Sequence, residues 1–125
     1  MTNNDLGEII LGCAMKVHSA LGPGLLESAY EACLAHELSK AQLGVKRQVA
    51  LPVVYDGMQL DAGFRIDLLV NDAVIVELKT AEKLLPIHKA QLLSYLKLSN
   101  KSLGYLLNFN VVHMRDGIKR IVNNY

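Results

Sequence analysis

The chain has 125 residues, of which 51% are hydrophobic and 20% charged, and its formal net charge is +1. This size and balance predict one globular domain over residues 1–125 and exclude an intrinsically disordered chain. No apolar run approaches the roughly 20 residues of a membrane span, and the N-terminus lacks the basic and apolar regions of a signal peptide. We therefore expect a cytoplasmic protein without a membrane partner.

Charge is distributed unevenly along the chain. Residues 1–78 carry 5 basic and 10 acidic side chains, a net −5, whereas residues 79–125 carry 8 basic and 2 acidic side chains, a net +6. This asymmetry fits a C-terminal part that faces an anion. The two cysteines, Cys13 and Cys33, have no metal-ligand spacing and are expected to be reduced thiols in helices.

Two amphipathic helices are predicted at the start of the chain. Apolar residues recur at steps of three and four over residues 5–21, and Asn3 or Asn4 can cap this helix. A Gly-Pro-Gly run ends it, and a second helix is expected over residues 25–40. Glu27 falls in the first turn of the second helix, where the helix N-terminus alone is one explanation for a carboxylate.

Alternation of apolar and polar residues predicts strands in the middle of the chain. A first strand is expected over residues 45–55, a hairpin turn at Asp56-Gly57, and a return strand over residues 59–70. A second polar turn at Asn71-Asp72 leads to a third strand over residues 73–79. These strands would form an antiparallel three-stranded meander.

The rest of the chain predicts one more helix and further strands. Pro86 fits the first turn of a helix over residues 86–98. Residues 103–109 form a short apolar strand that can join the sheet, and residues 111–114 with 118–122 predict a closing hairpin. The order ααβββαβ with a terminal β-hairpin indicates an α/β fold with a mixed central sheet flanked by helices.

Three charged residues interrupt the apolar strands: Asp67, Glu77 and Lys79. A carboxylate among Ile, Leu and Val is costly to desolvate unless it has a partner or a metal. Across the turn at Asn71-Asp72, Asp67 should lie near Glu77, and Lys79 shares the face of Glu77. Two carboxylates and a backbone carbonyl, here that of Leu78, suit Mg²⁺ or Mn²⁺, which can activate a water beside a phosphate.

Other readings of these polar residues remain open. Glu77 and Lys79 can also form a surface ion pair on an edge strand, although their apolar flanks indicate burial. Glu27 supplies a further metal ligand if the second helix packs over the sheet. Gln91 and Tyr95, spaced i and i+4, share one face of the third helix. A glutamine can hold a water or a phosphate, and a tyrosine can bond or stack.

Several of these motifs resemble those of one nuclease superfamily. Asp67 followed by Glu77-Leu78-Lys79 resembles the PD-(D/E)xK signature. Residues 63–67 and 91–95 resemble the GxxxD and QxxxY elements of its RecB-like branch. Residues 24–30, Gly-Leu-Leu-Glu-Ser-Ala-Tyr, match the pattern that names the GxxExxY protein family.

The resemblance extends over about residues 5–122 and departs from the superfamily name at Ile66, where the signature has a proline. It implies a restriction-endonuclease-like core and a Mg²⁺-dependent nuclease that hydrolyses phosphodiester bonds in DNA or RNA, with DNA favoured. The implied catalytic residues are Asp67, Glu77, Lys79, Gln91 and Glu27. The implied metal ligands are Asp67, Glu77, the Leu78 carbonyl and Glu27, and the implied substrate-binding residues are Tyr95, Tyr30 and Arg65.

The sequence is also compatible with two functions other than that of a nuclease that acts alone. One is a catalytically silent module on the same fold that binds nucleic acid or protein, and the other is a protein that acts only with a protein partner. The chain has no insertion that would recognise a particular sequence or DNA shape. Because such a small core would cover few base pairs, we expect a homodimer.

Overall fold

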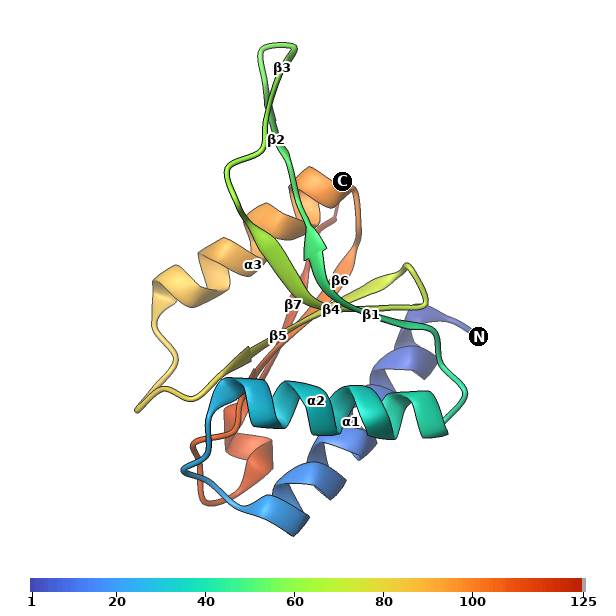
Figure 1. Cartoon of the computed structure of the whole chain (residues 1–125), viewed down its shortest axis with the longest axis vertical. Helices are drawn as coiled ribbons and strands as arrows, with labels where there is room; N and C mark the ends of the chain where they lie inside the picture. Colours follow the sequence, from blue (N-terminus) through green and yellow to red (C-terminus); the bar gives the residue numbers. More distant parts are fainter. Residues whose placement is uncertain (125) are drawn as a thin grey trace.

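The sheet at the centre of the fold has five strands in the order β1-β4-β5-β6-β7 (Figure 1). We describe it from a computed structural model, and the description extends over residues 1–124. The elements, in chain order, are α1 (Asn3–Leu21), α2 (Glu27–Lys40), β1 (Val45–Ala50), β2 (Val53–Tyr55), β3 (Met58–Leu60), β4 (Arg65–Val70), β5 (Val74–Lys79), α3 (Pro86–Ser99), β6 (Leu103–Asn108), the 3-10 helix η1 (Met114–Gly117) and β7 (Ile118–Val122).

The sheet is mixed and is covered on both faces, which confirms the expected fold class. β5 and β6 are parallel, whereas β1–β4, β4–β5 and β6–β7 are antiparallel. A parallel pair needs a crossover, and α3 supplies it. α1 and α2 lie on one face of the sheet and α3 on the other (Figure 1).

Two apolar clusters fill the spaces between the sheet and its helices. On the α1/α2 face, Leu6, Ile10 and Leu34 pack with Val76 and Leu78. On the α3 face, a second cluster brings α3 against the sheet through Leu92, Leu96, Ile75 and Leu106. Among residues 1–124, no helix is long and apolar enough to cross a membrane.

The helix termini differ slightly from the expected ones. Thr2, rather than Asn3 or Asn4, caps α1: its Oγ1 accepts a hydrogen bond from the Asp5 amide at 3.1 Å, and Asp5 accepts one from the Thr2 amide at 2.8 Å. This reciprocal capping box places the cap outside the asparagines. α2 begins at Glu27, two residues later than expected, so Glu27 is its first residue.

The two long strands expected over residues 45–55 and 59–70 are each broken into two. β2 and β3 form a separate hairpin, in which Val53 pairs with Leu60, and this hairpin stands away from the main sheet (Figure 1). Pro52 has no amide hydrogen for a ladder, and Gly63 adopts a φ of +80°, so the main sheet is interrupted at both places.

The closing hairpin expected from residues 111–114 and 118–122 does not form, because β7 pairs with β6 instead. The segment over residues 111–114 is a connection that ends in η1, and β7 pairs antiparallel with β6 from Leu103↔Val122 to Leu107↔Ile118. The expected strand over residues 111–114 is therefore wrong.

The turn between β4 and β5 is as tight as the sequence predicts. Asn71 and Asp72 adopt φ values of +51° and +53°, and the Ala73 amide donates to the Val70 carbonyl at 3.0 Å. Left-handed φ at both central residues is the geometry of a type I′ turn, whose twist matches that of paired strands. This turn sets the register in which Leu68 pairs with Val76.

Candidate active site

Asp67 and Glu77 meet where β4 and β5 cease to pair through their backbones. The last backbone pair is Leu68↔Val76. Beyond it, the Asp67 amide donates to Glu77 Oε2 at 2.7 Å, and the Leu78 amide donates to Asp67 Oδ2 at 2.9 Å. Each carboxylate therefore replaces a backbone acceptor of the ladder, which brings the two acidic side chains together while the strands separate.

Burial and mutual repulsion make this carboxylate pair costly to ionise. Glu77 is only 5% exposed, and its pKa is raised from 4.5 to about 8, first by desolvation and then by the negative charge of Asp67. The pKa of Asp67 is also raised, mainly by burial and further by the charge of Glu31, although the Leu78 amide and Gln48 oppose this rise. Burial and neighbouring carboxylates thus favour the protonated form of both side chains, and the charge of Lys79 only partly opposes this.

A cleft of about 350 Å³ opens beside Asp67 on the α2 face of the sheet. Its lining residues are Glu27, Ser28, Glu31, Gln48, Asp67 and Leu78. Glu27 is exposed at the start of α2, and Glu31 lies one helical turn later and is 7% exposed. The structure therefore brings the predicted residues Glu27 and Asp67 to one cleft and adds a second helix carboxylate, Glu31.

Glu31 is held by two side chains of β1. Arg47 donates to Glu31 Oε2 through Nε at 3.1 Å and Nη2 at 3.0 Å, and Gln48 Nε2 donates to Glu31 Oε1 at 2.5 Å. The same Gln48 nitrogen donates to Asp67 Oδ1 at 3.2 Å. Gln48 thus bridges the carboxylate of α2 and the carboxylate of β4.

The side-chain alternation of β1 and β4 changes at this bridge. In a regular strand, residues two or four apart share a face. In β1, however, Val45 packs with the α1/α2 cluster, whereas Val49 packs with the α3 cluster. In β4, Leu68 packs with the α1/α2 cluster, whereas Ile66 packs with the α3 cluster. Gln48, with a φ of +52°, and Asp67 occupy the positions between them. This reversal places both side chains in the cleft on the α2 side.

Lys79 ends β5 close to the carboxylate pair, and its positive charge opposes the rise in the pKa of both Asp67 and Glu77. The backbone around it is fixed by β6. The Lys79 carbonyl accepts from the Phe109 amide at 3.0 Å, and the buried Asn108 side chain donates to the Ala81 carbonyl at 2.9 Å and accepts from the Ala81 amide at 3.1 Å. Asn108 therefore anchors the segment that follows Lys79.

The residues predicted from α3 approach from the opposite face of the sheet. Tyr95 is 6% exposed, and the pKa of its hydroxyl is raised first by burial and then by the charges of Glu77 and Asp67. Its ring lies 6.1 Å from that of Phe64. Gln91, one turn earlier, is half-buried, and Arg65 is exposed beside this region. Neither Gln91 nor Tyr95 lines the cleft beside Asp67.

Tyr30 lies in the core rather than at a surface that a substrate can reach. Its side chain is 0% exposed, and its ring stacks on Phe109 with centroids 4.5 Å apart. The hydroxyl donates to the Gly22 carbonyl at 2.5 Å and accepts from the Leu25 amide at 3.1 Å. Tyr30 therefore fixes the loop before α2, which corrects its expected position as a substrate-binding residue.

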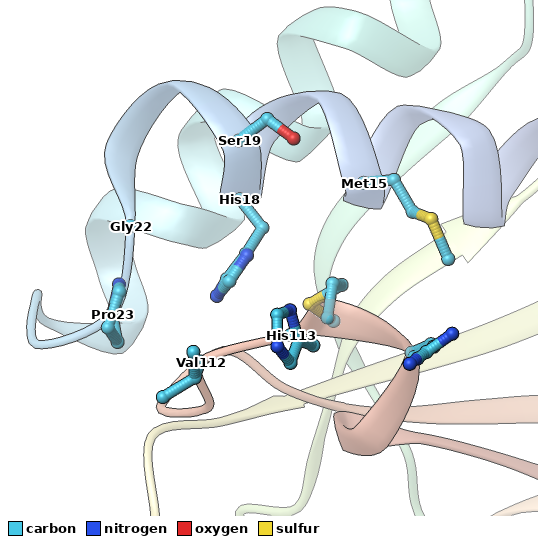
Figure 2. A pocket seen from close by; sticks show the side chains of 9 residues that line it. Met15, His18, Ser19, Gly22, Pro23, Val112 and His113 are labelled. Carbon is cyan, nitrogen blue, oxygen red and sulfur yellow. The ribbon is translucent and has the colours of Figure 1, made fainter.

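A larger hollow of about 610 Å³ lies between α1 and the segment before η1, and it shares no lining residue with the cleft. Figure 2 shows His18 from α1 and His113 from the opposite segment pointing into the same space. His18 Nε2 lies 2.7 Å from the Val111 carbonyl, so this side chain joins α1 to that segment. Within residues 1–124, no three His, Cys, Asp or Glu side chains are grouped closely enough to hold a metal ion by themselves.

Sequence reasoning missed Glu31, Arg47 and Gln48. Glu31 could have been found, because it is one turn after Glu27 and adjoins the apolar positions of the same helix. Arg47 and Gln48 carried no such signal. Regular alternation assigns them to opposite faces of β1, and only the positive φ at Gln48 directs both toward Glu31.

A five-strand mixed sheet between helices, with an Asp and a Glu-x-Lys on adjacent strands, is consistent with a restriction-endonuclease-like fold. A family model described as the PD-(D/E)XK nuclease superfamily matches residues 4–121. The chain therefore belongs to the PD-(D/E)XK nuclease superfamily. No curated protein and no solved structure matches it.

Proposed function

We propose that this protein is a Mg²⁺- or Mn²⁺-dependent nuclease that hydrolyses phosphodiester bonds in nucleic acid, with DNA favoured over RNA. The observation that carries the proposal is the contact between β4 and β5, where the Asp67 amide donates to Glu77 Oε2 at 2.7 Å. Lys79 follows on the same strand as Glu77. Membership of the superfamily suggests both nuclease activity and nucleic-acid binding.

The donor set fits a hard divalent cation, which members of this superfamily usually use. Asp67, Glu77 and the Leu78 carbonyl would hold it together with water, and Glu27, at the rim of the cleft, would become a further ligand only by moving closer. The pKa of Glu77 is raised to about 8, first by burial and then by the charge of Asp67, and a divalent cation bound here would favour the ionised carboxylates. Such an ion supplies an activated water and neutralises charge on the phosphate.

The other residues position the reactants in this proposal. Lys79 would donate a hydrogen bond to the attacking water or to a phosphoryl oxygen, since an ammonium group donates and cannot accept. Arg65, Gln91 and Tyr95 would contact the nucleic-acid strand from the α3 side. Salt-dependent binding is expected wherever such groups meet phosphates.

We also propose that the chain belongs to a GxxExxY branch of the superfamily, and the position of Tyr30 supports this proposal. The Tyr30 hydroxyl bonds Gly22 and Leu25, which fixes the segment that leads into Glu27. The glutamate of the motif is therefore held at the rim by the tyrosine of the same motif. This relationship gives the spacing between Glu27 and Tyr30 a physical reason.

A direct cleavage assay tests the proposed activity. The purified protein is incubated with labelled single-stranded DNA, double-stranded DNA and RNA in EDTA, Mg²⁺ or Mn²⁺. We expect metal-dependent cleavage of DNA that falls by about 100-fold or more in Lys79→Ala, which removes a cation that stabilises transition-state charge, and in Asp67→Asn, which removes a charged ligand of the metal. Lys83→Ala, at an exposed position in the following loop, is the matched lysine control. Cleavage that persists in both site variants, or in EDTA, would contradict the proposal.

A catalytically silent nucleic-acid-binding module on the same fold is the second candidate. It is favoured by the neutralisation of Glu31, which already accepts hydrogen bonds from Arg47 and Gln48. This candidate predicts DNA binding that depends on salt but is unchanged by EDTA, without cleavage. The expected homodimer stays a prediction, and sedimentation equilibrium with and without DNA tests it.

A further inference from the structure

Gln48 combines an unusual backbone with an unusual pair of contacts. It lies within an edge strand, yet its φ is +52°, a region that side chains other than glycine, asparagine and aspartate seldom adopt. Its amide nitrogen donates to Glu31 at 2.5 Å and to Asp67 at 3.2 Å. Because both neighbours are carboxylates, only the nitrogen of the amide, and not its oxygen, can serve them.

The left-handed backbone is what directs this amide into the cleft. A regular β1 would place Gln48 on the face opposite Val49 and Val45 alike, but these two valines pack on different sides of the sheet. The change of face therefore occurs at Gln48. Since Arg47 pairs with Leu68 and Val49 pairs with Ile66, Gln48 lies opposite Asp67. A left-handed residue is maintained in a strand only where its surroundings compensate for it.

Asp67 depends on Gln48 for half of its hydrogen bonding. One carboxylate oxygen, Oδ2, accepts from the Leu78 amide, and the other, Oδ1, accepts from Gln48. A carboxylate fixed through only one oxygen can rotate about its χ2 bond, whereas two donors define its plane. Each carboxylate oxygen still has a lone pair for a cation, since an ionised carboxylate offers about four acceptor positions.

We propose that Gln48 is a positioning residue of the metal centre, which orients the Asp67 carboxylate by bridging it to Glu31. This inference rests on the proposed role of Asp67 as a metal ligand. Partners that hydrogen-bond to metal ligands typically change metal affinity by 10–100-fold when they are removed. Gln48 acts through Asp67 and needs no contact of its own with the metal or the nucleic acid.

The variant Gln48→Gly distinguishes the role of the side-chain amide from that of the left-handed backbone, because it removes the amide and keeps a residue that tolerates positive φ. Glycine accepts a positive φ without strain, so the melting temperature is expected to stay unchanged or to rise. The Mn²⁺ dissociation constant, measured by isothermal titration calorimetry on the intact protein, is expected to increase by 10–100-fold. Gln42→Gly is the matched control, because Gln42 also has a positive φ, +66°, and lies outside the cleft. It should bind Mn²⁺ like the wild type.

A second variant, Gln48→Asn, and a second measurement, the Mn²⁺ dependence of cleavage, test the same role of Gln48. Gln48→Asn retains tolerance of left-handed φ but is one methylene too short to bridge both carboxylates, so it should also weaken Mn²⁺ binding. In cleavage assays, either variant should raise the half-saturating Mn²⁺ concentration while the rate at saturating Mn²⁺ stays within a few-fold of wild type. Wild-type Mn²⁺ affinity in both variants, or no Mn²⁺ binding by the wild type, would overturn the proposal. Mn²⁺ binding without cleavage would count against the nuclease and still test Gln48.

Discussion

Replacing Glu77 with glutamine should change how stability depends on pH. In the folded protein without metal, the pKa of Glu77 is raised from 4.5 to about 8. A raised carboxyl pKa means that the folded state holds the proton more tightly than the unfolded state. The resulting stabilisation is fully present below pH 4.5 and is lost as the pH rises through about 8.

The size of this effect follows from the shift of the pKa. At about 1.4 kcal/mol for each pH unit, the free energy of unfolding of the metal-free wild type should fall by up to about 5 kcal/mol relative to Glu77→Gln between pH 4.5 and 8. The raised pKa of Asp67 acts in the same direction in both proteins. Glutamine keeps an oxygen that can accept from the Asp67 amide, so the variant removes the charge without removing the contact.

Urea unfolding in EDTA at pH 5, 6.5 and 8 measures this difference. Glu82→Gln, at an exposed position outside the cleft, should follow the wild type. Addition of Mn²⁺ should stabilise the wild type most at pH 8, because a metal replaces the proton on its ligands. If the wild type and Glu77→Gln showed parallel pH profiles in EDTA, the account of a buried, repelled carboxylate pair would be refuted.

Three further substitutions test the packing of the protein by urea unfolding. Arg47→Ala should lower the free energy of unfolding by about 1–2 kcal/mol, because it removes the ionic partner of the buried Glu31. This loss is smaller than for a fully buried ion pair, because the arginine is half-exposed to solvent. An unchanged free energy of unfolding would show that Gln48 and water are enough to compensate the charge of Glu31. Gly117→Ala should destabilise by about 1–3 kcal/mol, because its Cβ would overlap the Asn108 carbonyl oxygen. Gly12→Ala, which has open space and a helical backbone, should stabilise by about 0.5–1 kcal/mol instead.

The carboxylate pair illustrates what local sequence rules can predict. The turn at Asn71-Asp72 and the two-residue period of a strand bring Asp67 close to Glu77, and a third loop residue, Ala73, sets the final register, in which Val70 pairs with Val74. The structure agrees, since the Leu68↔Val76 register leads directly to the contact between these residues. The parallel pairing of β5 and β6 requires a crossover between them, and α3 is the element that supplies it.

The cleft itself could not be predicted, because it depends on a reversal within β1. Alternation assigns Val45, Arg47 and Val49 to one face, and only the left-handed residue Gln48 changes this. A glutamine at such a φ has no local sequence signal, since glycine or asparagine is the usual choice. Tyr30 illustrates a different limit: the motif marks this residue but does not say that its side chain is buried and hydrogen-bonded to the Gly22 carbonyl.

The type I′ turn at Asn71-Asp72 has a consequence for engineering this protein. Because this turn helps to set the phase of β5 against β4, a residue inserted there and absorbed by a shift of β5 would turn the Glu77 side chain to the other face of the sheet while leaving two pairable strands. Such a protein could keep its fold and lose its carboxylate pair. Tags or recognition segments are better inserted at the tip of the β2–β3 hairpin. This hairpin is separate from the main sheet, and none of its residues lines the cleft.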